Sequence, residues 1–260
     1  MPLNEIQQEL LRVQANYKAL QQKAHKDYKA VVVSGFSQSI EPVRSFLKLT
    51  PETKNGICQA LVDSWIIAHA NEGSLWNDLY TNVNGIPSLK IDRMKALLAQ
   101  FAVGLGTGEK SMGPYQKLNT EVTLMRNGVI PRMNLSDGHR MYDDGYNTSG
   151  GQLVADGQLA DKILGTLPMH KSHGLGVGSY AMISIKSAKG GHVMVAYLGG
   201  TGRSKDPNAP FSDVAFFDPN VGEYWFQDAS EFARFFRYLV GRIYSTYGGY
   251  QIRSFARKVD

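Results

Sequence analysis

The spacing of apolar residues changes along this chain from a helical pattern in the first half to a strand pattern in the second. Apolar residues recur every three or four positions in residues 3–30, 58–69 and 89–105, which predicts amphipathic helices. Beyond residue 178 the apolar runs are short and separated by Gly-Gly, Gly-Thr-Gly and Asp-Pro-Asn, which is typical of strands joined by tight turns. Helices followed by neighbouring strands predict an α+β fold with an antiparallel sheet.

Turn and capping signals indicate where further elements begin. Ser88 is expected to cap the helix that follows it, after a loop that holds Asn84 and Gly85. Asp228 or Ser230 is expected to cap a later helix. The other expected elements are a strand-like run at 31–33, a short helix at 42–47, and strands at 179–187, 192–200, 214–219, 222–226 and 250–258.

Composition and charge exclude several classes of protein. The chain is 43% hydrophobic and 20% charged, as in an ordinary globular protein. Its net charge of +5 is spread out rather than gathered in aromatic-rich basic patches, so no nucleic-acid partner is expected. No stretch approaches the ~20 apolar residues that span a membrane. The N-terminus lacks the apolar segment of a cleavable secretory signal.

Cys58 is the only cysteine of the 260 residues, so the chain cannot form an internal disulfide. Gly56 permits a tight turn before it, and apolar residues from Leu61 to Ile66 then recur with helical spacing. A thiol at a helix N-terminus lies beside unpaired backbone N–H groups, which is the environment of a nucleophile. A lone cysteine is also compatible with a small buried apolar residue, so the interpretation depends on its partners.

A cysteine nucleophile needs a base, and the base needs an acceptor that orients its ring. Of the six histidines, His192 is the best placed, because it opens the run VMVAYL after two glycines. Asp218 closes the next long run, AFFDP, and antiparallel pairing of the two strands would bring it near His192. A surface histidine and a turn-forming aspartate are the ordinary alternatives. The order of the three residues predicts Cys58, His192 and Asp218 as a catalytic set.

Three windows of the sequence resemble the YopT-type cysteine peptidase family of the papain-like clan. They are GICQALVDSW around Cys58, GHVMVAYL around His192 and, most distinctive, FFDPNVGEYWF around Asp218. The resemblance extends in motif order over residues 50–245. It implies a papain-like fold, in which a helical subdomain carrying the nucleophile helix packs on a central antiparallel β-sheet. By position, Cys58 would be the nucleophile, His192 the base and Asp218 the residue that orients it.

The resemblance also implies how such a protein acts. Relatives enter eukaryotic host cells and cut prenylated Rho-type GTPases or host kinases, and some process their own N-terminus. We therefore expect a bacterial effector, secreted without a cleavable Sec signal, that acts on a host protein in the host cytoplasm without a cofactor or metal. Residues 1–30 would be a helical arm or delivery segment, and 31–260 the peptidase domain. Compared with the family pattern, residues 107–160 are expected to be an insertion.

A peptidase of this clan also needs donors for an oxyanion hole. The clan uses the N–H of the cysteine and an amide side chain upstream of it. Asn55 is the nearest candidate, three residues before the thiol. Gln59 is also close in sequence, but as a helix residue it would point elsewhere.

Two other functions use the same residues or the same fold. Enzymes that deamidate or cross-link glutamine share the Cys–His–Asp set, and the sequence does not separate transfer to water from transfer to an amine. A non-enzymatic interaction protein on an old protease fold is the other alternative.

Other motifs are weak. The segment GLGTGEKS has a Glu where a phosphate-binding loop needs Gly. His170 and His173 lack a third zinc ligand nearby. Asp137, Asp143 and Asp144 lack the terminal glutamate of a calcium loop and are expected to form a solvated acidic loop, which could line an acidic substrate cleft.

Overall fold

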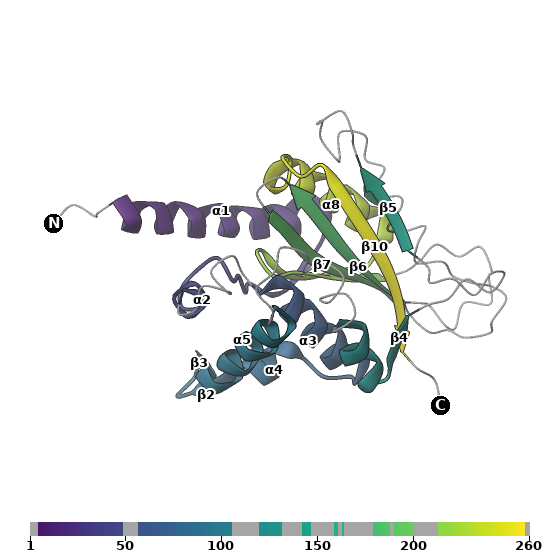
Figure 1. The fold of residues 1–260 in the computed structure, drawn as a ribbon. Coiled ribbons are helices and arrows are strands. Elements are labelled where there is room, and N and C mark those ends of the chain that lie inside the picture. The colour runs from purple at the N-terminus through teal and green to yellow at the C-terminus, as the bar shows by residue number, and fades with distance from the viewer. Residues whose placement is uncertain are drawn as a thin grey trace, which may run out of the picture.

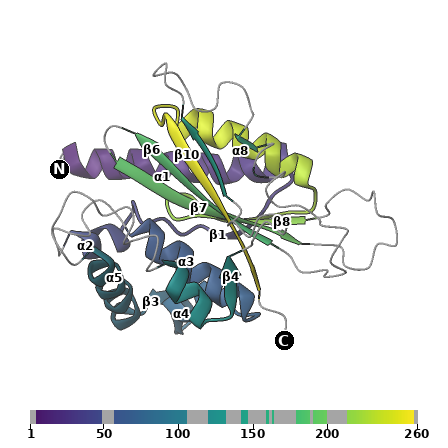
Figure 2. The same cartoon turned by 45° about the vertical axis from the view of Figure 1, so that its right-hand side comes forward.

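An antiparallel sheet between two helical layers forms the core of the computed structural model (Figures 1 and 2). Helices α1 (Glu5–Tyr28) and α8 (Ala229–Ile243) cover one face of the sheet. The other layer contains α2 (Val43–Leu47), α3 (Cys58–Ala70), α4 (Leu75–Leu79) and α5 (Ile91–Leu105). The residues that the structure describes are 5–48, 57–105, 120–131, 142–146, 159–160, 163, 179–187, 190–199 and 213–257.

The sheet has eight strands in the order β1-β9-β8-β7-β6-β10-β4, with β5 also paired to β10. All its neighbours are antiparallel. The last strand lies inside the sheet rather than at its edge, because β10 pairs with β6 on one side and with β4 and β5 on the other. The strands are β1 (Val31–Ser34), β4 (Val129–Pro131), β5 (Tyr142–Tyr146), β6 (Ser179–Ser187), β7 (Gly190–Gly199), β8 (Asp213–Asp218), β9 (Gly222–Phe226) and β10 (Gly249–Arg257).

Two hydrophobic clusters hold the layers together, one on each face of the sheet. Because side chains alternate along a strand, neighbouring residues of β8 serve different clusters. Phe216 packs against the phenylalanines of α8, and Phe217 packs against Trp65 of α3. Fully burying a side chain of this size contributes about 1.5–3 kcal/mol. The predicted α+β class, with the nucleophile helix packed on a central antiparallel sheet, is therefore confirmed.

The segment before α5 is a β-hairpin, not the loop expected from the sequence. Strands β2 (Tyr80–Val83) and β3 (Ile86–Leu89) pair with each other apart from the main sheet. Asn84 and Gly85 between them have φ angles of 53° and 83°, as a tight two-residue hairpin turn requires. Ser88 pairs with Thr81 within this hairpin, so the prediction that Ser88 caps α5 was wrong.

The C-terminal part of α1 belongs to the core. Leu20 and Ala24 are buried in the cluster beneath α8. The ring of Tyr28 lies 5.7 Å from that of Phe235 and 5.9 Å from that of Tyr238.

Within the expected insertion at 107–160, residues 120–126 are helical and β4 and β5 join the sheet. The described parts of the N-terminal arm (residues 1–30) and of the expected insertion therefore pack with the rest of the domain.

Candidate active site

Cys58 is the first residue of α3 and is half-buried. The helix is held against the sheet by its apolar face, on which Leu61 and Trp65 are buried. The Trp65 ring stacks on Phe217 of β8 with ring centroids 6.1 Å apart. Ile57 caps the helix without a side-chain bond of its own, and its N–H donates to Gln38 Oε1 at 2.9 Å. The thiol is therefore presented at the start of a well-packed helix, as the sequence predicted.

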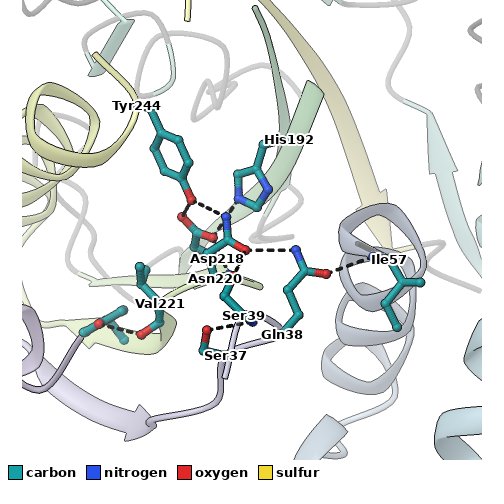
Figure 3. A network of polar contacts seen from close by, with 10 residues as sticks. Ser37, Gln38, Ser39, Ile57, His192, Asp218, Asn220, Val221 and Tyr244 are labelled. Atoms are coloured by element: carbon teal, nitrogen blue, oxygen red, sulfur yellow. Dashed lines mark hydrogen bonds and ion pairs between the residues drawn. The ribbon is translucent and has the colours of Figure 1, made fainter. Parts of the chain in front are cut away.

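His192 and Asp218 meet on neighbouring strands at one end of the sheet (Figure 3). His192 lies near the start of β7 and Asp218 at the end of the adjacent antiparallel strand β8. His192 Nε2 lies 2.7 Å from Asp218 Oδ1, and the two side chains are only 4% and 0% exposed. A buried charge is tolerated when it is paired and hydrogen-bonded, as this one is.

Two further residues hold Asp218 in place, and sequence reasoning missed both. The N–H of Asn220 donates to Asp218 Oδ1 at 2.8 Å. The hydroxyl of Tyr244 donates to Asp218 Oδ2 at 2.7 Å, and its ring stacks on that of His192 at 5.0 Å. The aspartate is thus oriented from several sides while it accepts from the histidine. The Asp-Pro-Asn string was a signal for Asn220, because such residues accept and donate within turns.

The electrostatics of the pair favour a charged imidazole. Burial alone lowers the pKa of His192, but the charge and hydrogen bond of Asp218 and a hydrogen bond with Cys58 outweigh it and raise the pKa to about 10. Burial and the nearby Asp218 raise the pKa of Tyr244 well above its ordinary value, so its hydroxyl stays a donor. Cys58 therefore helps to raise the pKa of the same ring that Asp218 orients.

A glycine after Asp218 shapes the turn that carries it. Gly222 has φ of +112°, which side chains rarely adopt, and a Cβ there would lie 2.3 Å from the carbonyl oxygen of Ser34. The β8–β9 turn can therefore approach β1 only with glycine at this position. This gives a physical reason for the Gly in the FFDPNVGEYWF window.

The described part of the structure places neither of the two candidate oxyanion donors, Asn55 and Gln59, beside the thiol. Asn55 lies outside the described residues. Gln59 is buried, and its Nε2 donates to Asp63 Oδ1 at 2.7 Å and lies 3.4 Å from Met182 Sδ. Burial raises the pKa of Asp63 to about 6, against the opposing effect of hydrogen bonds from Gln59 and Thr120. The amide of Gln59 thus belongs to a polar cluster under α3, as its helix position suggested.

Metal sites and membrane spans have no support in the part of the chain that the structure describes. There, no three His, Cys, Asp or Glu residues group together as metal ligands. Among the same residues, no helix combines the length and apolarity that crossing a bilayer requires. His170, His173 and Asp137 lie outside the described residues, and for Asp143 and Asp144 only the backbone, in β5, is described.

Comparison with known proteins places the sequence of this chain in a family. The Peptidase C58 model, described as Yersinia/Haemophilus virulence surface antigen, matches residues 21–256. The chain is 30% identical over 197 residues to cysteine protease yopT1 of Yersinia enterocolitica, covering 71% of this chain and 50% of that relative. It is 29% identical over 195 residues to cysteine protease YopT of Yersinia pestis, with the same coverage. The chain thus spans about half the length of these curated relatives.

Solved structures give weaker likenesses. The Pseudomonas avirulence protein AvrPphB aligns with a TM-score of 0.47 at 15% identity, covering 79% of this chain and 94% of that one. The YopT domain of the Pasteurella multocida PfhB2 toxin aligns with a TM-score of 0.37 at 20% identity, covering 82% and 87%. The family itself is shown by the sequence match, which begins within α1 and extends into β10. The chain therefore belongs to the Peptidase C58 family, the YopT-type cysteine peptidases that its three sequence windows resemble.

Proposed function

We propose that this chain is an effector-type cysteine peptidase that hydrolyses peptide bonds in a host protein through Cys58, His192 and Asp218. The observation that carries the proposal is the buried hydrogen bond of 2.7 Å between His192 and Asp218. Cys58, at the start of α3, contributes to the raised pKa of the same ring. Base and orienter are within hydrogen-bond reach of each other, as a nucleophilic mechanism needs. Membership of the family supports the same chemistry.

The geometry assigns a role to each ring nitrogen of His192. Because Nε2 is bonded to Asp218, Nδ1 is the nitrogen left to exchange a proton with Cys58. The thiolate attacks the peptide carbonyl carbon and forms a C–S bond, and the imidazolium gives its proton to the leaving amine as the C–N bond breaks. A water molecule then gives a proton to His192 while its oxygen attacks the acyl carbon, which releases the acid and frees Cys58. Asp218 holds the charged ring throughout.

The oxyanion of the tetrahedral intermediate needs donors near Cys58. The backbone N–H of Cys58 is one of the first in α3 and has no carbonyl partner within the helix. We propose it as one donor and keep Asn55 as the candidate for the second.

The substrate follows from the family resemblance rather than from contacts in the structure. We propose a protein of the host cytoplasm, with a small GTPase or a kinase as the first classes to test, reached by secretion from a bacterium without a cleavable signal. The Yersinia relatives are named cysteine proteases, which is consistent with a protein substrate.

Mass spectrometry of a treated eukaryotic cell lysate tests the proposed reaction. Wild-type protein should create new protein N-termini that are missing after treatment with Cys58→Ala or His192→Gln. A mass gain of about one dalton at glutamines, with no new N-termini, would instead indicate deamidation by the same residues. If a lysate treated with the wild-type protein shows neither change, the proposal is contradicted and a non-enzymatic interaction protein is favoured.

A further inference from the structure

Gln38 joins the two halves of the candidate active site, although no sequence motif singled it out. It lies in the segment between β1 and α2 and is only 5% exposed. In Figure 3 its side chain lies between Asn220, from the turn after Asp218, and Ile57, from the start of the nucleophile helix. Ile57 directly precedes Cys58 in sequence, and Asn220 follows Asp218 by two residues.

Three hydrogen bonds hold Gln38 between the sheet and the helix. Its side-chain Oε1 accepts from the N–H of Ile57 at 2.9 Å. Its Nε2 donates to Asn220 Oδ1 at 3.0 Å, and its backbone N–H donates to the carbonyl of Pro219 at 2.8 Å. One end of the amide therefore binds the nucleophile helix, and the other end binds the turn that carries Asp218.

Hydrogen bonds continue from Gln38 to His192 through Asn220, Tyr244 and Asp218. Asn220 Nδ2 donates to the hydroxyl of Tyr244 at 3.1 Å, and that hydroxyl donates to Asp218. Asp218 in turn accepts from His192. A continuous chain of hydrogen bonds thus runs from the N–H before Cys58 to the imidazole, and Gln38 is its link between the two layers (Figure 3).

The chemistry of this link requires an amide. Ile57 presents a donor and Asn220 presents an acceptor, so the side chain between them must accept at one end and donate at the other. A carboxylate would accept at both ends, and an apolar side chain would leave buried polar groups without these partners, which costs free energy. A residue that only filled space would not need both functions.

We propose that Gln38 is a positioning residue, which fixes the start of the nucleophile helix relative to the His192–Asp218 pair. This inference rests on the proposed function, because it concerns the distance between the proposed nucleophile and its base. Gln38 acts through Ile57 and Asn220 and does not itself take part in bond making. Small displacements of reacting groups have large effects on rate, and a misplacement of ~1 Å can cost about a hundredfold.

The reaction of Cys58 with iodoacetamide tests this role without knowledge of the substrate. Cys58 is the only cysteine, so the alkylation rate reports on it alone. Gln38→Met keeps the shape of the side chain but loses both hydrogen bonds. Gln38→Glu keeps the acceptor for Ile57 and loses the donor to Asn220. Phe232→Leu, at a buried core residue of α8, is the control for a general loss of stability.

We expect Gln38→Met to lower the alkylation rate at about pH 6 by about tenfold or more and to bring its pH profile towards that of His192→Gln. The alkylation rate of Gln38→Glu should lie between those of Gln38→Met and wild type. Phe232→Leu should lower the Tm but keep the alkylation rate and the pH profile of wild type. Because Gln38→Glu is close in shape to the native residue, it keeps the test informative if Gln38→Met does not fold.

Two results would overturn the inference, and they are distinguishable. If both Gln38 variants keep the wild-type rate and profile while His192→Gln loses them, Gln38 has no positioning role and the proposed function stands. If wild type and His192→Gln react alike, the proposed function fails and this inference fails with it.

Discussion

At the scale of single residues, the site depends on a charge buried between His192 and Asp218. Both side chains are almost completely removed from solvent, and their attraction is screened less than that of a surface pair. Asp218 accepts from His192, Tyr244 and the N–H of Asn220, so its buried oxygens have three hydrogen-bond donors inside the protein. The pair is therefore organised before any substrate binds.

This pair predicts a pH dependence of stability. The pKa of His192 is raised to about 10 in the folded protein, above the ~6.5 of an unfolded histidine. The stabilisation is therefore fully present below about pH 6.5 and is lost as the pH rises towards about 10. Urea unfolding at stepped pH should show a loss in wild type, on the order of a few kcal/mol, that is absent in His192→Gln.

The exposed His25 of α1 provides the control for this measurement. His25→Gln makes the same chemical change at a residue that is largely exposed to solvent. It should keep the wild-type loss of stability between about pH 6.5 and 10. A parallel pH dependence of wild type and His192→Gln would contradict the account of the pair.

The residues of the site differ in how far the sequence could predict them. Cys58, His192 and Asp218 carry reactive groups at the ends of recognisable elements, so type and position pointed to them. Gln38 and Asn220 lie 182 residues apart and meet only because β1 packs beside β9. No local pattern encodes such a contact. The amide link was therefore visible only in the folded protein.

At the scale of elements, the β8–β9 turn carries Asp218 and depends on Gly222. A Cβ at Gly222 would meet the backbone of Ser34 at 2.3 Å, whereas one at Gly241 in α8 would meet nothing within 4 Å. Gly222→Ala should lower the free energy of unfolding by about 1–3 kcal/mol. Gly241→Ala should raise it by up to about 1 kcal/mol, because alanine favours a helix. Thermal unfolding of both variants checks this; a stabilised Gly222→Ala would contradict it.

Helix α1 gives a prediction about truncation and self-processing. Leu20 and Ala24 are buried, and the half-buried Tyr17 packs against the same hydrophobic cluster. Removing residues 1–28 should lower the Tm strongly because the core is opened. Removing residues 1–13 should lower it much less, because Tyr17, Leu20 and Ala24 stay in place. Calorimetry of the two truncated proteins measures the difference.

The same packing limits where self-cleavage is compatible with the fold. We expect any processed N-terminus to lie before Tyr17, and intact mass of wild type compared with Cys58→Ala measures it. A stable, active product that begins after Tyr28 would contradict the role given to α1.

Elements with long, regular patterns were predictable, and those set by a few residues were not. The helix that begins after Asp228 starts where its capping signal indicated, since Asp228 accepts from Ser230 N at 2.7 Å. The hairpin at Asn84-Gly85 was missed, although this pair favours a tight turn. Strand β5 lies in a segment rich in Asp and Gly and forms because β10 provides its partner. Pairing across the sheet decided that case, not local propensity.

At the scale of the whole molecule, the candidate site forms where two layers meet. The helical layer supplies Cys58 from α3, and the sheet supplies His192 from β7 and Asp218 from β8. Figure 2 shows α3 beneath these strands. The hydrophobic cluster around Trp65 and Phe217 fixes the helix on the sheet, and the amide of Gln38 fixes its first turn. The order of elements along the chain predicted this arrangement, but the relative placement of the layers comes from packing.

The alkylation rate of Cys58 across pH tests the central claim most directly, because it asks whether His192 activates this one thiol. The rate constants of folded wild type, His192→Gln and urea-unfolded wild type are compared from about pH 5 to 9. We expect folded wild type to react at least about tenfold faster than both others at about pH 6, where an unactivated thiol is almost entirely protonated. Equal rates for the three samples at that pH would contradict the account.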